Sequence, residues 1–73
     1  MNSESQQIEI MINGEPRSVA TDLTVSELLA QLDLTRERVA VEHNLSILSQ
    51  RYWADTRLKA GDRLEIVHFV GGG

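Results

Sequence analysis

The fold of this chain is decided by residues 8–19, which read IEIMINGEPRSV. Isoleucine occupies every second position of the first five, which is the period of a strand with one buried face. Asn13-Gly14 follows, and both residue types tolerate the positive φ angles of a two-residue hairpin turn. Residues 15–19 then read as the return strand. Because Pro16 has no N–H to donate, this strand is expected near a sheet edge or with Pro16 at its start.

A helix is predicted directly after the hairpin. Thr24 and Glu27 stand three residues apart and form a capping box, in which each side chain accepts a bond from the other residue's backbone N–H. The apolar residues that follow fall at i, i+3, i+4 and i+7, so they form one stripe able to cover a sheet. The stripe consists of Val25, Leu28, Leu29 and Leu32.

The rest of the chain alternates short apolar runs with turns. We expect, in order, a strand at 39–41, a short strand at Ile47-Leu48, a helical turn at 50–54 carrying Trp53 as a core anchor, a turn at 60–62 and a final strand at 64–70. One helix on one face of a mixed sheet is an α+β architecture. With the helix as a right-handed crossover, the first and last strands can pair in parallel at the centre.

This order predicts a β-grasp (ubiquitin-like) fold, with a mixed sheet of four or five strands, one main helix and a flexible C-terminal glycine tail. The predicted domain spans 1–70, including a polar leader at 1–6, and the reactive tail spans 71–73. The residues expected in the core are Ile8, Ile10, Ile12, Val25, Leu28, Leu29, Leu32, Val41, Leu58, Leu64 and Ile66.

Composition excludes several function classes. The 73 residues contain no cysteine, which excludes disulfides, thiolate-bound metal and a thiol nucleophile. A net charge of −4 argues against non-specific nucleic-acid binding, because that binding depends on neutralising phosphates. Neither a secretion signal nor an apolar run of membrane-spanning length is present. We therefore expect a soluble cytoplasmic domain, monomeric when free, with no nucleic-acid or membrane partner.

The final strand has two faces with different roles. Leu64 and Ile66 are assigned to the core, because Glu65 on the opposite face must meet water. Val67 and Phe69 then lie on the open face, just before the tail. An exposed aromatic residue at such a position favours contact with a partner, since aromatic side chains dominate interface energetics. The alternative is that loops fold over this face and bury Phe69. The predicted partner-docking residues are Phe69, Val67 and Val70.

The tail Gly71-Gly72-Gly73 combines three useful properties. Without Cβ atoms it fits a narrow channel and lets backbone approach a reactive group. The α-carboxyl group is ionised at neutral pH, so it can attack the α-phosphorus of ATP and form an acyl-adenylate. The chain has no phosphate-binding glycine motif of its own, so ATP must be bound by a partner enzyme. The predicted reactive residue is Gly73, with Gly72 and Gly71 as its tail.

His43 and His68 are the candidates for acid–base or metal chemistry. Two histidines without cysteine and without a carboxylate cluster make a poor metal site. We expect His68 to be a partly buried strand residue and His43 to end a strand. No catalytic, cofactor-binding or metal-binding residue is predicted within the chain.

Several fragments, taken in order, resemble the ThiS family of sulfur carrier proteins of thiamine biosynthesis. The resemblance runs from about Ile8 to Gly73. It rests on residues 12–17 (INGEPR), 23–29 (LTVSELL), 39–42 (VAVE), 51–53 (RYW) and 61–73 (GDRLEIVHFVGGG). The chain departs from the family pattern at 43–49 (HNLSILS), where many members carry Gly after the Asn and Pro a few residues later.

The resemblance implies a carrier rather than an enzyme, with no bound cofactor. An E1-like adenylyltransferase (ThiF-like) would adenylate Gly73 with ATP. Sulfur originating from a cysteine desulfurase would convert the acyl-adenylate to a thiocarboxylate. A thiazole synthase (ThiG-like) would then take that sulfur into the thiazole ring.

Three other functions are compatible with the same features. The small subunit of molybdopterin synthase shares this fold and a Gly-Gly end. A non-covalent ubiquitin-like binding module would use the surface and leave the tail inert. A protein tag would use the activated carboxyl group to acylate a lysine.

Overall fold

The computed structural model describes residues 6–69. Within this range the chain forms five strands, one α-helix and two 3-10 helices. In chain order they are β1 (Gln7–Ile12), β2 (Glu15–Ala20), α1 (Val25–Gln31), η1 (Arg36–Arg38), β3 (Val39–His43), β4 (Ser46–Leu48), η2 (Gln50–Asp55) and β5 (Arg63–His68). Every predicted element is present.

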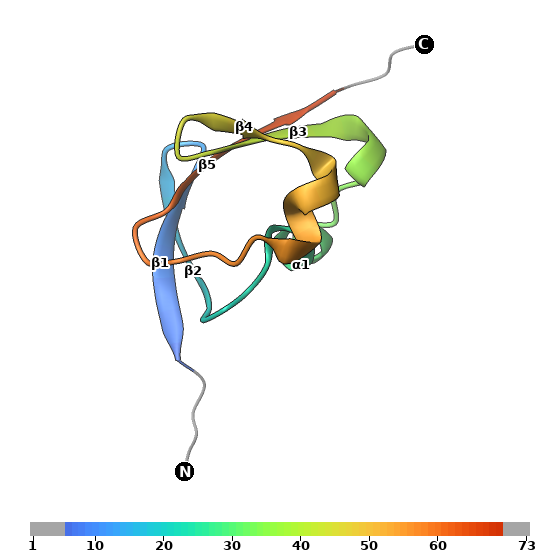
Figure 1. Cartoon of the computed structure of the whole chain (residues 1–73). Coiled ribbons are helices and arrows are strands. Elements are labelled where there is room, and N and C mark those ends of the chain that lie inside the picture. Colours follow the sequence, from blue (N-terminus) through green and yellow to red (C-terminus); the bar gives the residue numbers. More distant parts are fainter. Residues whose placement is uncertain (1–5, 70–73) are drawn as a thin grey trace.

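The strands form one mixed sheet in the order β2-β1-β5-β3-β4. β1 and β5 pair in parallel, whereas β5 and β3 pair antiparallel, so β5 lies at the centre. The sheet curves around α1 and η2, which pack against each other on one side of it (Figure 1). This arrangement confirms the predicted β-grasp fold and the central parallel pair of first and last strands.

The opening hairpin forms as its sequence predicts. Asn13 and Gly14 have φ angles of 51° and 84°, the left-handed values that a two-residue hairpin turn requires. β2 lies at the edge of the sheet, and its Pro16 pairs with Met11 of β1. Proline has no N–H to donate, and an edge strand tolerates this because only one of its sides takes part in the hydrogen bonding of the sheet.

The capping box of α1 is also present. The Thr24 hydroxyl accepts from the Glu27 N–H at 3.1 Å, and the Glu27 carboxylate accepts from the Thr24 N–H at 2.9 Å. The helix begins at Val25, directly after this cap. Val25, Leu28 and Leu29 are buried against the sheet, so the predicted stripe is the face that packs.

The core is close to the predicted one. Seven of the predicted core residues are buried: Ile10, Val25, Leu28, Leu29, Val41, Leu58 and Leu64. The other four lie at the periphery and are partly buried: Ile8, Ile12, Leu32 and Ile66. Trp53 is a core anchor as expected, at 3% exposure with its indole N–H donating to the Leu48 carbonyl at 3.0 Å. The prediction missed Val19, Leu23 and Val39.

One expectation about the last strand was wrong. His68 is exposed rather than partly buried. It is the final residue of β5, whereas the pairing of β1 with β5 ends at Ile12 opposite Leu64. The end of β5 therefore extends past its neighbour, and the side chain there meets solvent. His43 does end β3, as predicted.

The predicted boundary between the domain and the tail, at residues 70 and 71, lies outside the described residues. None of the helices within 6–69 has the length and apolar character needed to cross a membrane.

Candidate docking face and reactive end

The end of β5 carries two exposed apolar side chains. Val67 is 55% exposed and Phe69 is 54% exposed. Both side chains are exposed, so the alternative in which loops bury Phe69 is wrong; Val67 lies on the same face of β5 as Glu65, opposite to Leu64 and Ile66. A docking role for these side chains stays a prediction. The third predicted docking residue, Val70, and the reactive glycines Gly71 to Gly73 lie outside the described residues.

β5 is held as far as Ile66 on the β1 side and as far as Phe69 on the β3 side. On the β1 side, the Asn13 amide accepts from the Ile66 N–H at 2.7 Å and donates to the Ile66 carbonyl at 3.1 Å. On the β3 side, the Phe69 N–H donates to the Arg38 carbonyl at 2.7 Å. The strand therefore leads to the glycines from a fixed position rather than from a frayed end.

The open face is hollowed next to Val67. A groove of about 520 Å³ lies over β3, β4 and β5. Its apolar side chains include Leu45 and Ile47, which are 87% and 81% exposed. The residues that line it are Ala40, Val41, Glu42, Leu45, Ile47, Glu65 and Val67. We call this the open-face groove.

Leu45 lies in a strained turn between β3 and β4. Asn44 and Leu45 have φ angles of 52° and 75°, so both are left-handed, as in a two-residue hairpin loop. Asn tolerates this conformation, whereas for Leu it costs about 1–2 kcal/mol because Cβ crowds the following carbonyl. This is the position at which the sequence departs from the ThiS pattern. The departure keeps a tight turn and places an apolar side chain at the rim of the groove.

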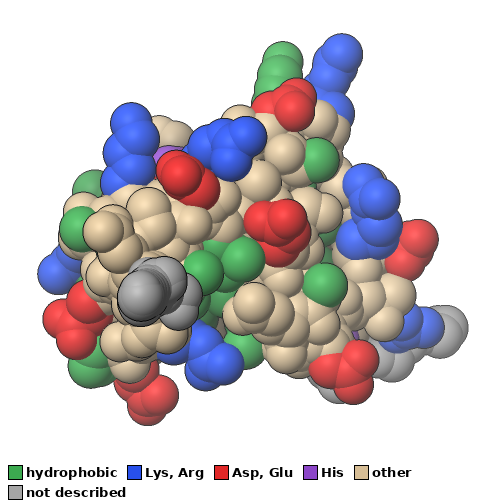
Figure 2. Space-filling model, turned by 90° about the horizontal axis from the view of Figure 1, so that it is seen from below, with side chains coloured by type: hydrophobic (Ala, Val, Ile, Leu, Met, Phe, Trp, Pro, Cys, Tyr) green, Lys and Arg blue, Asp and Glu red, His purple; other side chains and the backbone are tan. Residues whose placement is uncertain are grey.

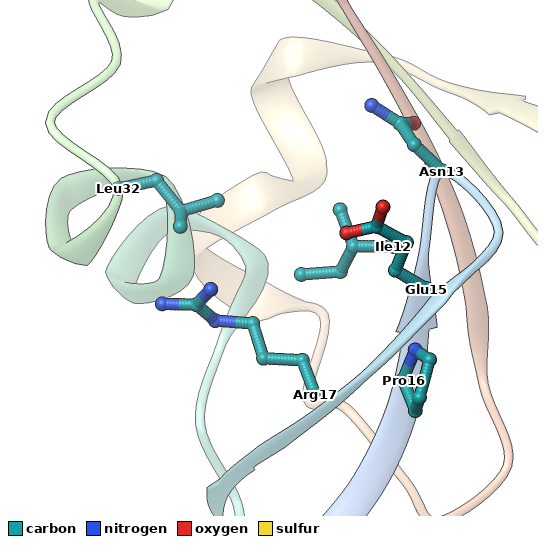
Figure 3. A pocket seen from close by; sticks show the side chains of 6 residues that line it. All are labelled: Ile12, Asn13, Glu15, Pro16, Arg17 and Leu32. Atoms are coloured by element: carbon teal, nitrogen blue, oxygen red, sulfur yellow. The ribbon is translucent and has the colours of Figure 1, made fainter.

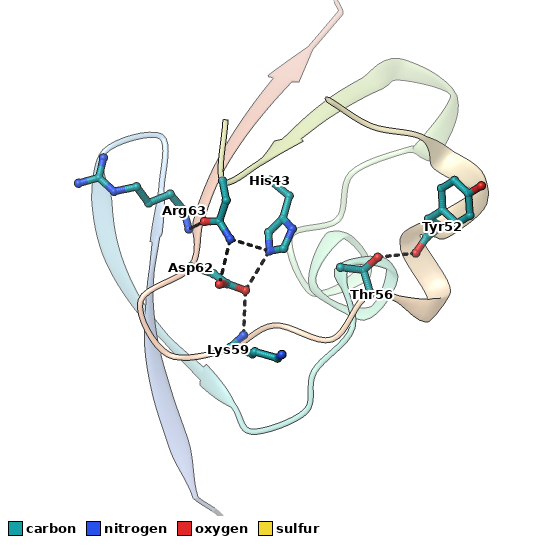
Figure 4. A network of polar contacts seen from close by, with 7 residues as sticks. His43, Tyr52, Thr56, Lys59, Asp62 and Arg63 are labelled. Atoms are coloured by element: carbon teal, nitrogen blue, oxygen red, sulfur yellow. Dashed lines mark hydrogen bonds and ion pairs between the residues drawn. The ribbon is translucent and has the colours of Figure 1, made fainter. Parts of the chain in front are cut away.

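A polar network holds this turn against the start of β5 (Figure 4). Asp62 accepts from the Lys59 N–H at 2.9 Å and from the Asn44 amide at 3.2 Å, and contacts His43 Nε2 at 2.9 Å. The Asn44 side chain also accepts from the Arg63 N–H at 2.9 Å. The loop is therefore fixed by side chains as well as by its own backbone.

The environment of Asp62 shifts its titration. Burial raises the pKa of this carboxyl group, but hydrogen bonds from His43, the Lys59 N–H and Asn44, with the charge of His43, outweigh burial. The net result is a pKa below the ordinary value. The carboxylate is therefore ionised at neutral pH and suited to fixing the turn.

A second hollow lies on the other side of the sheet, between the hairpin and the C-terminal end of α1. The side chains of Ile12, Glu15, Arg17 and Leu32 point into it (Figure 3). Its volume is about 340 Å³. Glu15 and Arg17 place opposite charges around an apolar floor, which is typical of a solvated edge. This hollow lies at the far edge from the open-face groove.

Among residues 6–69, no three His, Cys, Asp or Glu side chains gather closely enough to hold a metal ion. Acidic and basic side chains are interspersed on the face seen from below (Figure 2), as on an ordinary solvated surface. The candidate functional features are therefore the open-face groove, with its exposed apolar side chains, and the end of β5 beside it.

The sequence analysis missed three contributors to this site. Leu45 and Ile47 were not assigned to the open face, and the Asp62 network was not anticipated. Leu45 directly after Asn44, between two expected strands, was the available indication of the first, because an apolar residue has no local reason to be in such a connection. The partners of Asp62 are up to 19 residues away in sequence, and no local pattern reveals them.

Comparison with known proteins identifies the family. The model of the ThiS family matches residues 10–73. The chain is 37% identical over 65 residues to the sulfur carrier protein ThiS of Bacillus subtilis, covering 88% of this chain and 98% of that protein. It is 42% identical over 66 residues to a thiazole synthase of Paramagnetospirillum magneticum, covering 90% of this chain. The chain spans only 20% of the length of that thiazole synthase.

A solved structure agrees with these relatives. The crystal structure of the thiamine biosynthesis protein ThiS from Geobacter metallireducens superposes with a TM-score of 0.77 at 38% identity. The match covers 90% of this chain and all of that one. On the family match, the relatives and the shared fold, this chain belongs to the ThiS family.

Proposed function

We propose that this chain is a sulfur carrier protein of thiamine biosynthesis. The single observation that carries the proposal is the family match, which extends over residues 10–73 and so includes the glycines. The fold supports it, because β5 is fixed as far as Phe69 and the reactive group follows shortly after. The protein acts as a co-substrate rather than as an enzyme, since it is consumed and regenerated in each cycle.

The first chemical step is adenylation of Gly73. One carboxylate oxygen of Gly73 attacks the α-phosphorus of ATP in the active site of an E1-like (ThiF-like) enzyme. A new O–P bond forms, the bond to the β-phosphate breaks and pyrophosphate leaves. The product is a mixed anhydride whose acyl carbon is activated, because AMP is a far better leaving group than hydroxide.

The second step places sulfur on Gly73. A persulfide that originates from a cysteine desulfurase attacks the acyl carbon, and AMP leaves. A thiol reductant then cleaves the S–S bond and releases the donor, so a thiocarboxylate remains on Gly73. A ThiG-like thiazole synthase takes this sulfur into the thiazole ring, and the carboxylate is regenerated.

The relatives support the last partner in particular. A thiazole synthase contains a segment that resembles nearly all of this chain. Two functions carried by one polypeptide are held at high effective concentration, which is useful when they act on the same intermediate. We therefore propose thiazole synthase as the enzyme that receives the sulfur.

Genetic complementation tests this function. In a strain that lacks this gene, the full chain restores growth without added thiazole, whereas a variant lacking Gly73 does not. Molybdenum-dependent enzyme activity is the control, and it is unchanged in both strains. Growth with the truncated chain would identify a non-covalent binding module, and loss of molybdenum-dependent activity would identify a molybdopterin-synthase subunit; either result contradicts the proposal.

A further inference from the structure

Two carboxylates face each other in the open-face groove. In the register of β3 with β5, Glu42 lies directly opposite Glu65. On its other side, Glu42 lies opposite Ile47 of β4. Like charges directly opposite each other destabilise a sheet, so this pair costs stability in the free protein. Both side chains are exposed, and neither forms an ion pair with another residue within 6–69.

The next row of the face leaves a space beside this pair. Ala40 lies opposite Val67, and its single methyl group forms a low floor between larger neighbours. Ile47 lies beside Glu42 in the row of the carboxylate pair, and Leu45 lies in the turn that precedes β4; both are largely exposed. The groove therefore offers a hollow for an apolar side chain immediately beside two carboxylates.

This combination has a specific chemical complement. An arginine or lysine between Glu42 and Glu65 would remove their mutual repulsion, and a guanidinium can bond both carboxylates at once. An apolar side chain over Ala40 would cover the methyl groups of Ile47 and Val67. A partner segment that carries both groups satisfies every exposed feature of the groove, whereas water satisfies only the carboxylates.

The groove lies close along the chain to Gly73, which points to an enzyme that binds Gly73 as its occupant. Val67 lines the groove, and from Val67 to Gly73 the chain reaches at most about 20 Å when fully extended. An enzyme that binds the Gly73 carboxyl group therefore lies within about 20 Å of the groove, close enough to contact it. The relative that contains a similar segment is a thiazole synthase, which favours that enzyme as the occupant.

We propose that the open-face groove docks a cationic and apolar segment of the thiazole synthase, with an arginine or lysine of that enzyme between Glu42 and Glu65. This proposal rests on the proposed function for the identity of the partner. Two features lower the stability of the free chain: the repulsion between the two carboxylates and the strain at Leu45. In the complex, the partner's cation removes the repulsion, and the exposed Leu45 side chain gains an apolar contact. The groove thereby selects a partner by charge as well as by shape.

Single charge reversals test the docking. In Glu42→Lys or Glu65→Lys, the repulsive pair becomes an attractive cross-strand pair, so the melting temperature of the free chain rises. Binding of the purified thiazole synthase, measured by calorimetry, weakens at least about tenfold, because the partner's cation now meets a lysine. The matched control is Glu15→Lys, which makes the same charge change at the far edge of the sheet and leaves binding within about twofold.

Salt dependence gives a second measurement that folding defects do not affect. Binding of the wild-type chain weakens as salt rises from about 0.05 to about 0.5 M, because screening reduces the attraction between the carboxylates and the partner's cation. The Glu42→Gln/Glu65→Gln variant binds more weakly at low salt and loses most of this dependence.

Three outcomes would overturn the proposal. Both reversals could bind the thiazole synthase as the wild type does, or they could affect only the adenylating enzyme. The chain alone could also dimerise through this face in sedimentation experiments. Thiocarboxylate formation on the wild type and the same variants is measured separately. If the wild type accepts no sulfur, the proposed sulfur-carrier function fails. If the variants accept sulfur normally and bind the thiazole synthase as the wild type does, only the docking role of the open-face groove is refuted.

Discussion

The Asn13 side chain and the Ile66 backbone are joined by two hydrogen bonds, at 2.7 Å from the Ile66 N–H and at 3.1 Å to its carbonyl. Pairing of β1 with β5 stops at Ile12, so the Asn13 amide occupies the place of the next peptide group. The side chain of Asn13 thus continues the hydrogen bonding between β1 and β5 beyond the last paired residue of β1. It fixes β5 close to the point where the chain leaves the sheet.

Asn13→Gly isolates the contribution of this amide. Glycine adopts the φ of 51° at this position without strain, so the variant loses the two side-chain bonds and adds only the flexibility of glycine in the unfolded chain, which costs roughly 0.5–1 kcal/mol. We expect a loss of about 1–2 kcal/mol in the free energy of unfolding, measured with urea. Asn13→Ala should be less stable still, because alanine adds a left-handed strain. Equal stability of Asn13→Gly and the wild type would show that the amide bonds contribute nothing.

Leu45→Gly should stabilise the free chain. The substitution removes a strain of about 1–2 kcal/mol, and the added flexibility of glycine in the unfolded chain costs roughly 0.5–1 kcal/mol. No packing is lost, because Leu45 is 87% exposed. The net gain is up to about 1.5 kcal/mol, visible as a higher urea midpoint.

Leu45→Ile is the control for the strain at this turn. It keeps an apolar side chain, but branching at Cβ makes the left-handed conformation worse, so the variant should be less stable than the wild type. If Leu45→Gly were destabilised instead, the side chain would have to make contacts in the free protein that its exposure contradicts.

The Asp62 network makes stability depend on pH at the acid end. Because its pKa is lowered in the folded chain, Asp62 contributes stability that is fully present above the unfolded value, near about 3.9, and is lost as pH falls through the lower folded value. Asp62→Asn should therefore be less stable than the wild type at neutral pH, by about 1–3 kcal/mol. The difference should shrink below about pH 4.

Urea unfolding across this pH range measures the effect. Asp55→Asn, at an exposed position in η2, is the matched control and should follow the wild type at every pH. A difference between Asp62→Asn and the wild type that stays constant down to about pH 2 would show that the charge of Asp62 is not what the fold uses.

Local patterns in the sequence were enough to predict the elements and their order. The Asn13-Gly14 turn, the Thr24 capping box and the apolar stripe of α1 each act within a few residues, and each is present in the structure. The alternation in β5 placed Val67 on the open face for the same reason, and Phe69, directly after the strand, is exposed as expected. In a small domain, once the strands, the helix and its apolar face are fixed by these local patterns, few topologies can bury that face against a single sheet.

The contacts that shape the site are not local and could not be predicted in this way. Asn13 bonds to a residue 53 positions away, and Asp62 bonds to His43 across 19 positions. The Glu42–Glu65 pair depends on the register of β3 with β5, which hydrophobic alternation leaves free to shift by two residues. His68 was misplaced because its exposure depends on where β1 ends, not on its own alternation.

The central claim is that Gly73 carries sulfur, and the mass of the protein tests it most directly. The chain is incubated with ATP, its adenylating enzyme, a cysteine desulfurase, cysteine and a thiol reductant, and the intact protein is then weighed. We predict a gain equal to the replacement of one oxygen by sulfur, located on Gly73 by fragmentation, and absent without ATP. An unchanged mass, in a mixture whose adenylating enzyme forms the acyl-adenylate on this chain, would contradict the account.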